Sequence, residues 1–402
     1  MNMGDCFGKD RAWIELDMGA LRHNVAALRA LLPPGCALMP AVKADAYGHG
    51  AVLIARELNR LGVRAFCVAS AREGAQLRGS GVEGEILVLG YTHPRLIPLL
   101  YRSRLTQTVL DASYAECLNQ AGLPLEVQIK IDTGMHRLGE RWTQIDALER
   151  IFACRNLHVA GAFTHLCADE TTGEEDRAYT LAQARAFQNA VAALRKRGCR
   201  VPKVHALASY GLLNYPEIGG DYARTGIALY GVLSCASHAV PRAAALQPVL
   251  SLKTRVAQVQ MLQPGERAGY DLRFTARRET RLAVLSIGYA DGLPRSLSCG
   301  VGAVLLHGCR APVVGRICMD QTLVDATEIP ETAPGDEAVL IGNSGAEKIT
   351  ACDVAEAAGT ISNEILSRLG ARLERIAVAP ESDQNTAAVN NSTARAMRQA
   401  CF

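Results

Sequence analysis

Short apolar runs alternate with longer amphipathic segments through the first half of the chain. The runs are rich in Val, Ile and Leu, and this alternation is typical of parallel strands joined by helices. We predict eight strands: Leu38–Lys43, Ala65–Ser70, Ile86–Tyr91, Thr106–Asp111, Glu126–Asp132, His158–His165, Lys203–Ser209 and Tyr222–Leu229. Helices are predicted between them, for example at Ala51–Leu61, Gln144–Cys154 and Thr180–Arg195. An open doubly wound sheet shares the alternation, but the number of repeats favours a (β/α)8 TIM barrel.

The pattern changes after residue 248, where short strand-like runs are separated by Gly or Pro turns. The predicted strands are Ser251–Leu262, Arg281–Tyr289, Val301–Leu306, Pro312–Arg316, Thr322–Ala326 and Glu337–Ile341. We therefore predict a barrel over residues 11–248 and a mostly β domain over 249–379. Residues 11–17 are strand-like and are candidates to join the later sheet. Residues 1–10 and the Ser-, Asn- and Ala-rich segment 380–402 are predicted to be disordered.

Composition excludes several classes of partner. The chain has 43 Lys+Arg against 40 Asp+Glu, so no basic stripe favours nucleic acid. No apolar run approaches the ~18 residues of a membrane span, and the N-terminus lacks the pattern of a signal peptide. The 13 cysteines never occur as CxxC, which favours small core residues over disulfides or a zinc site. These features indicate a cytoplasmic protein with a small neutral or zwitterionic ligand.

A lysine closes the first predicted barrel strand, in the segment Pro40-Ala41-Val42-Lys43-Ala44-Asp45-Ala46-Tyr47-Gly48-His49-Gly50. A barrel places its reactive groups at the carboxyl ends of its strands. Partly dry surroundings favour the neutral amine that a Schiff base requires. Lys43 is therefore a candidate nucleophile, the alternative being a rim lysine whose ammonium reaches water.

Four further segments follow in order: Lys130-Ile131-Asp132-Thr133-Gly134-Met135-His136-Arg137-Leu138-Gly139, Arg224-Thr225-Gly226-Ile227-Ala228-Leu229-Tyr230-Gly231, Gly288-Tyr289-Ala290-Asp291-Gly292 and Gly315-Arg316-Ile317-Cys318-Met319-Asp320-Gln321. With the Lys43 segment, they resemble the pyridoxal 5'-phosphate (PLP) alanine racemase family over roughly residues 11–379. The resemblance implies a fold-type III PLP enzyme, with a barrel followed by a β domain.

The resemblance also implies the reactive groups. Racemisation removes a proton from one face of a planar intermediate and returns it to the other, so it needs two bases. Lys43, which is similar to the lysine that binds PLP, is one base, and Tyr270 is similar to the second. His165 and Arg224 match the groups that assist this tyrosine. Arg224 also resembles the arginine facing the pyridine nitrogen, where it weakens the electron sink.

Further roles are implied for the cofactor and substrate. Tyr47, Ser209 and the backbone of Gly226 and Ile227 resemble the phosphate contacts. Arg137 and Met319 resemble contacts to the substrate carboxylate, and Lys130 matches a lysine that becomes carbamylated and then holds Arg137. The residues matching Tyr270, Tyr289, Met319 and Asp320 come from the partner subunit in the family, which implies a homodimer with shared sites.

Three departures from the family pattern bear on specificity. The run His205-Ala206-Leu207-Ala208-Ser209 lacks the usual Asn before Ser, and Tyr270 is followed by Asp271 instead of Gly. Asn363 occupies the position of a tyrosine that gates the substrate methyl and contacts phosphate, unless it merely caps a helix beginning at Glu364. These changes resemble the catalytic domain of vancomycin-resistance serine racemases. In full form those proteins carry a membrane domain, so the chain is a free-standing relative or the cytosolic part of a longer protein.

We therefore predict a racemase of serine, with alanine as second substrate, that supplies D-amino acids for peptidoglycan. A strict alanine racemase is the first alternative. The others are a non-catalytic PLP-binding barrel and a decarboxylase of the same fold, and an acidic residue in place of Arg224 would have favoured the decarboxylase.

Overall fold

The computed structural model describes residues 9–171, 173–235, 240 and 245–378. The segments predicted to be disordered, 1–10 and 380–402, therefore lie outside the described residues apart from Lys9 and Asp10. The chain divides into two compact units. Among the described residues, Val25–Leu229 forms the larger part of one unit, and residues 9–24, 230–235 and 246–378 form the other. They are called here the N-terminal and C-terminal units.

The N-terminal unit is built on parallel strands, which confirms the predicted barrel. Six strands pair in the order β3 (Ala65–Val68), β4 (Glu85–Val88), β5 (Thr106–Val109), β6 (Leu125–Asp132), β8 (Leu157–Phe163) and β9 (Lys203–His205). The short strands β2 (Ala37–Leu38) and β10 (Tyr222–Ala223) pair with each other. Parallel bridges Ala41–Cys67 and Ala208–Arg224 connect that pair to the two ends of the six-stranded order, so the sheet curls round to meet itself.

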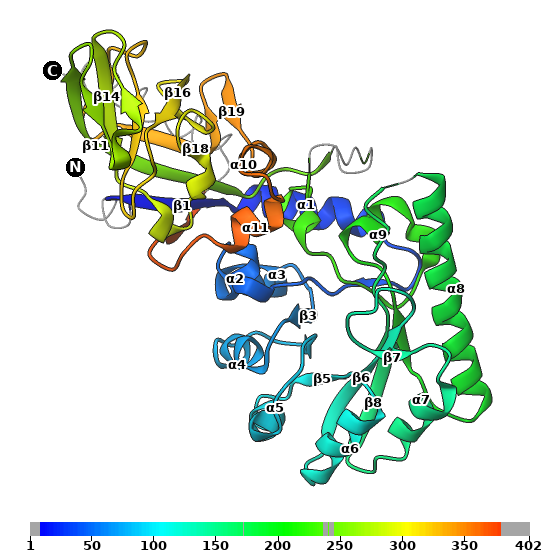
Figure 1. Ribbon diagram of the computed structural model, residues 1–402. Coiled ribbons are helices and arrows are strands. Elements are labelled where there is room, and N and C mark those ends of the chain that lie inside the picture. Colours follow the sequence, from blue (N-terminus) through cyan, green and yellow to red (C-terminus); the bar gives the residue numbers. More distant parts are fainter. Residues whose placement is uncertain (1–8, 172, 236–239, 241–244, 379–402) are drawn as a thin grey trace, which may run out of the picture. The chain divides into compact units, whose positions relative to one another are not determined.

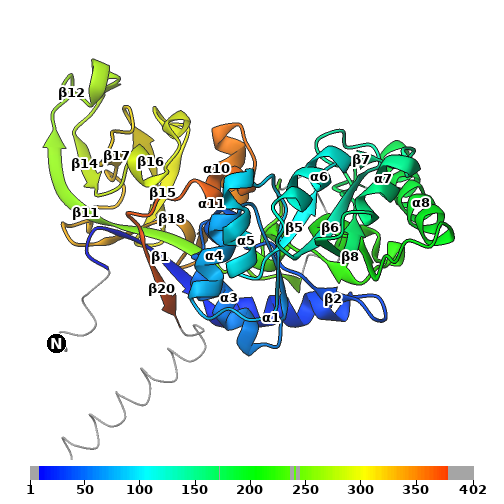
Figure 2. The ribbon, with the colours of Figure 1, turned by 90° about the horizontal axis from the view of Figure 1, so that it is seen from below.

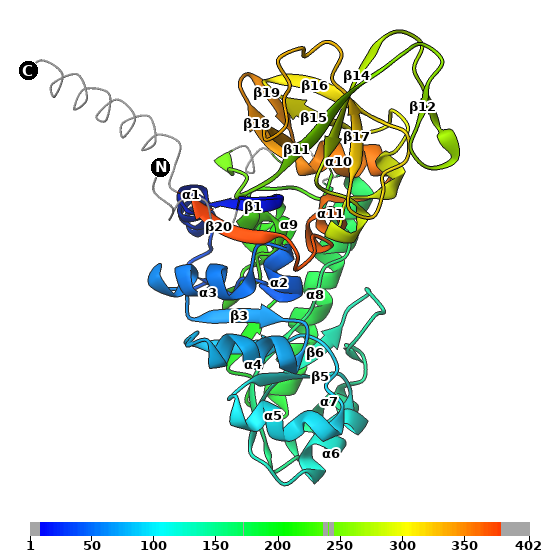
Figure 3. The same cartoon turned by 90° about the vertical axis from the view of Figure 1, so that its left-hand side faces the viewer.

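Helices alternate with these strands, as Figures 1 and 3 show. The predicted helices are confirmed as α3 (Ala51–Arg60), α7 (Ile145–Phe152) and α8 (Glu174–Lys196). The other barrel helices are α4 (Ala71–Gly79), α5 (Ile97–Arg102), α6 (Ala112–Gln120) and α9 (Ser209–Asn214). Strands β3 to β5 are almost wholly buried because helices cover their outer face and side chains fill the interior.

The C-terminal unit contains a nine-stranded sheet, which confirms its β character. Its order is β19 (Glu347–Ile349), β18 (Glu337–Ser344), β15 (Ala303–Leu306), β16 (Cys309–Val314), β17 (Thr322–Asp325), β14 (Thr280–Leu285), β11 (Leu250–Leu262), β1 (Ala12–Asp17) and β20 (Glu374–Val378). An extra pairing of β18 with β11 closes six strands into a ring, visible in Figure 2. Strand β1 does join this sheet, as residues 11–17 suggested, and β20 runs parallel to it.

The cysteines only partly fit the prediction. All 11 cysteines within the described residues are free, but only Cys67 and Cys154 are buried. The interpretation of the cysteines as core residues is therefore wrong for most of them, because the other nine are partly or fully exposed. Within the same part of the chain, no helix is both long and apolar enough to cross a membrane.

Candidate active site

Lys43 begins a turn (α2, Lys43–Tyr47) with an unusual backbone. The next four residues, Ala44–Tyr47, have φ between 51° and 55°, a left-handed region that side chains disfavour. Two carboxylates support the turn: Asp45 accepts from the Ala51 N–H at 2.7 Å, and Glu73 accepts from the Ala44 N–H at 2.9 Å. Such strain persists where the surroundings enforce it, commonly at functional sites.

Neighbouring arginines lower the pKa values of two lysines in the N-terminal unit. Burial and the nearby Arg137 lower the pKa of Lys43. Burial, Arg224 and Arg137 lower the pKa of Lys130 to about 7. Burial lowers the pKa of Arg224 to about 10, which still leaves it charged at neutral pH. Concentrated positive charge of this kind favours an anionic ligand.

Arg224 is buried. One nitrogen, Nη1, lies 2.5 Å from His205 Nδ1, and Nη2 donates to the Thr164 carbonyl at 2.6 Å. The guanidinium also lies 5.1 Å from the centre of the Phe163 ring. These contacts come from neighbouring strands, so they hold the guanidinium in one orientation.

Gln128 and Glu85, which were not predicted as site residues, extend this network. His205 Nε2 lies 2.6 Å from Gln128 Oε1, and Gln128 Nε2 donates to Glu85 at 2.6 Å. Lys203 and Tyr222 donate to the same carboxylate at 3.3 and 3.1 Å. Because arginine only donates, His205 Nδ1 must accept from Arg224 and the ring proton must lie on Nε2. In the sequence, the signal for this network was the presence of polar residues inside otherwise apolar strands.

Three of the predicted phosphate contacts, Ser209, Gly226 and Tyr47, lie close together. Ser209 Oγ accepts from the N–H groups of Gly226 at 2.9 Å and Ala228 at 3.3 Å. A Cβ atom at position 226 would lie 2.6 Å from the Tyr47 hydroxyl, so glycine permits this close approach. Burial raises the pKa of Tyr47 to about 12, which keeps its hydroxyl protonated as a donor. Ala208, where the family has Asn, leaves α9 without a side-chain cap.

His165 follows strand β8 and is neutral at pH 7. Burial lowers its pKa well below the ordinary value, and Arg224, Lys130, Arg137 and Lys43 lower it further. A neutral imidazole can accept a hydrogen bond. This is the protonation state needed by a group that assists a tyrosine.

The structure brings one set of predicted site residues together in the N-terminal unit: Lys43, Tyr47, Lys130, Arg137, His165, Ser209, Arg224, Gly226 and Ile227. The remaining predicted residues belong to the C-terminal unit: Tyr270, Tyr289, Met319, Asp320 and Asn363. The sequence motifs thus divide between the two units.

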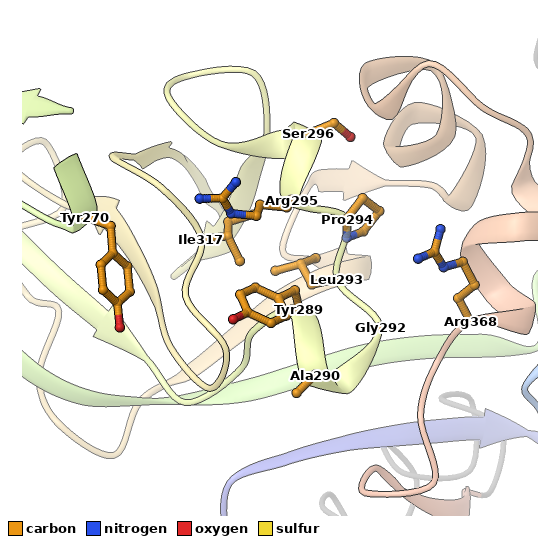
Figure 4. Close-up of a pocket in the computed structure, with 10 residues that line it drawn as sticks. All are labelled: Tyr270, Tyr289, Ala290, Gly292, Leu293, Pro294, Arg295, Ser296, Ile317 and Arg368. Atoms are coloured by element: carbon orange, nitrogen blue, oxygen red, sulfur yellow. The ribbon is translucent and has the colours of Figure 1, made fainter.

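Tyr270 and Tyr289 line a cavity of about 730 Å³ in the C-terminal unit (Figure 4). Their exposed fractions are 66% and 42%, and that of Met319 is 52%. Large exposed side chains gathered in this way mark interaction surfaces. Asp271 has a φ of 56°, which explains why glycine usually follows the tyrosine, and an ion pair with Arg316 at 2.9 Å holds it.

Asn363 lies inside helix α11 (Ser362–Ser367). Ile361 occupies the N-cap position and no side chain caps the helix, so the alternative role of Asn363 as a cap before Glu364 is wrong. Its Oδ1 atom is buried and has no hydrogen-bond partner among the described residues. An unpaired buried acceptor is costly, which makes this oxygen a candidate ligand contact.

Comparisons with known proteins agree with these motifs. Residues 16–234 match the family model "Alanine racemase, N-terminal domain" and residues 249–377 match "Alanine racemase, C-terminal domain". An amino-acid racemase of Enterococcus faecalis is 42% identical over 91% of the chain and 52% of its own length. An alanine racemase of Desulfovibrio desulfuricans is 39% identical over 91% of the chain and 98% of its own length.

Solved structures of alanine racemases are also similar to this chain. Alanine racemase of Clostridium difficile 630 has a TM-score of 0.86 and 30% identity, covering 92% of this chain and 96% of its own. Alanine racemase of Streptomyces coelicolor has a TM-score of 0.83 and 35% identity, covering 92% and 98%. The chain spans about half the length of the Enterococcus amino-acid racemases.

Proposed function

Since the chain belongs to the PLP-dependent alanine racemase family, we propose that it is a PLP-dependent racemase that interconverts L- and D-serine, and also L- and D-alanine. The observation that carries the proposal is the placement of Lys43, with its lowered pKa, near Arg137, which also lies close to Lys130. The D-amino acids would serve as precursors of peptidoglycan.

The residues of the N-terminal unit fit PLP. The grouped cations suit a phosphate-bearing anion, and the glycine at position 226 lets the Tyr47 hydroxyl approach the backbone there. Lys43 would hold the cofactor aldehyde, Tyr47 and Ser209 its phosphate, and Arg224 its ring nitrogen. When bound, PLP supplies a carbonyl for the amino group and withdraws electrons from the α-carbon.

Lys43 and Tyr270 would move the proton on opposite faces of the substrate. The lowered pKa of Lys43 increases the fraction of neutral amine that can take a proton. His165, neutral at pH 7, can accept a hydrogen bond from the phenol and so favour proton release. Arg224 carries a fixed charge that resists protonation of the ring nitrogen, which suits proton exchange over other reactions.

A homodimer would complete each site, with Tyr270, Tyr289, Met319 and Asp320 supplied by the partner. The exposure of Tyr270 and Met319 supports this arrangement, because neither is covered within its own unit. Arg137, itself exposed, would bind the substrate carboxylate. Asn363 would contact the serine hydroxyl, and the unpaired Oδ1 supports that role.

A strict alanine racemase is the second candidate. The chain matches the Desulfovibrio desulfuricans enzyme over nearly its full length, and that relative is named alanine racemase. This name favours the second candidate. Following D-isomer formation from L-serine, L-alanine and L-lysine separately would distinguish the two candidates. D-serine formation at a rate comparable with D-alanine supports the first, and D-alanine alone supports the second.

Borohydride treatment of the PLP-loaded protein is expected to fix the cofactor on Lys43. The lowered pKa of this amine favours covalent attachment. Peptide mapping would locate the pyridoxyl group, with Lys43→Ala as control. A reduced adduct on another lysine, or a colourless protein that ignores added PLP, would contradict the assignment.

Lys130 is expected to carry a carbamate. With a pKa of about 7, roughly half of this amine is neutral at pH 7, whereas an ordinary lysine is almost wholly protonated. The modification would replace a cation beside Arg137 with an anion that attracts it. At fixed CO2 pressure, a ¹³C carbamate resonance should grow as pH rises through 7 and vanish in Lys130→Ala. Its absence from the wild-type protein would refute the modification.

A further inference from the structure

A carboxylate with no exposed surface joins separate segments of the C-terminal unit. Asp291 is 0% exposed and accepts from the Gly288 N–H at 3.0 Å and from Arg11 Nη1 at 3.1 Å. The second nitrogen of Arg11 contacts its other oxygen. Arg372 Nε lies 3.4 Å from the same carboxylate. A buried charge is tolerated only with such partners, so Asp291 fixes the segments that supply them.

Arg372 spans two carboxylates. While its Nε faces Asp291, its Nη2 donates to Asp320 Oδ1 at 2.7 Å. These two acids belong to different loops, residues 286–292 and 315–321. One guanidinium therefore connects the buried carboxylate with the loop that carries Met319 and Asp320.

Backbone hydrogen bonds join the same two loops. The Tyr289 N–H donates to the Cys318 carbonyl and the Ala290 N–H to the Met319 carbonyl, both at 3.0 Å. A side chain at position 288 would lie 2.3 Å from the Met319 oxygen, so glycine is required for this approach. The loops are thus in contact over their backbones while Tyr289 and Met319 remain exposed.

We infer that Arg372, together with Arg11, positions the loops that present Tyr289, Met319 and Asp320 to the substrate. Their exposure, 42% for Tyr289 and 52% for Met319, means that side-chain packing does little to fix them. Their placement depends on the backbone of the loops, which the ion pairs hold. Arg372 and Arg11 are positioning residues, and the link to substrate rests on the proposed function.

Arg372→Lys tests the inference with little risk to folding, because the Arg372 side chain is 46% exposed. Lysine keeps the charge but offers a single ammonium group that cannot match both contacts of the guanidinium. Hydrogen exchange at the Tyr289 and Ala290 amides is expected to become about tenfold faster. Arg310→Lys is the matched control, since Arg310 also makes two contacts, to Glu347 and the Lys348 carbonyl.

Kinetics provide the second readout. Arg372→Lys should raise KM for serine and alanine about tenfold while kcat stays within about threefold, a split that a general loss of folded protein would not give. Arg11→Lys should change exchange and KM in the same direction. Unchanged amide exchange, or unchanged KM, in Arg372→Lys would overturn the inference. A wild-type protein without racemase activity would refute the proposed function, and the exchange comparison would still decide whether Arg372 holds the loops.

Discussion

Tyr270→Phe is expected to slow racemisation in both directions by about 10²–10⁴-fold, the usual contribution of a general acid or base. The phenyl ring preserves the shape of the side chain but can neither take nor return a proton. The visible absorbance of bound PLP should remain, because the cofactor contacts lie in the N-terminal unit. Initial rates from both isomers would measure the effect, with Tyr101→Phe as an exposed control.

The same variant tests the shared site. Lys43→Ala and Tyr270→Phe are each expected to be nearly inactive, but a mixed dimer would contain one site with both bases. Random exchange of subunits should then restore about a quarter of the wild-type sites. If Tyr270→Phe retained near-normal rates, a group other than Tyr270 would have to move the proton on that face of the substrate. Lack of recovery despite proven subunit exchange would place both bases on one chain.

Strands β3 and β4 were predictable because they are almost wholly buried and read as nearly continuous apolar runs. Strand β4 has the sequence Glu-Ile-Leu-Val and β3 has Ala-Phe-Cys-Val, both bounded by turns. Strand β20 was missed since its five residues, Glu-Arg-Ile-Ala-Val, alternate weakly and pair with a strand more than 350 positions earlier. A pairing partner that distant leaves no local pattern.

The residues of the candidate site were also only partly predictable from the sequence. Motifs identified Lys43 and Arg224 because their neighbours in sequence are distinctive. Gln128 and Glu85 form their hydrogen bond across strands separated by 43 positions, and nothing in either local segment indicates the other. The left-handed turn after Lys43 was equally hidden, since three of its four residues are Ala or Tyr, which carry no turn signal.

Asn363→Tyr is expected to lower kcat/KM for serine relative to alanine by about five- to a hundredfold. Leaving the serine hydroxyl unpaired in a closed site costs roughly 1–3 kcal/mol. Asn363 supplies a buried Oδ1 that lacks a partner among the described residues, and a tyrosine would replace this acceptor with a ring. Stability should change little through capping, because Ile361 and not Asn363 is the N-cap residue.

Asn363→Tyr both removes the amide and adds a ring, and Asn363→Ala separates these two effects. It removes the amide without adding a ring, so a fall in the serine-to-alanine ratio of kcat/KM in both variants would assign the preference to the lost hydrogen bond. A fall in Asn363→Tyr alone would assign it to the volume of the tyrosine. Thermal unfolding of each variant would establish that the protein compared is folded. An unchanged ratio in folded Asn363→Tyr would remove the specificity role of this position and make strict alanine racemase the better description.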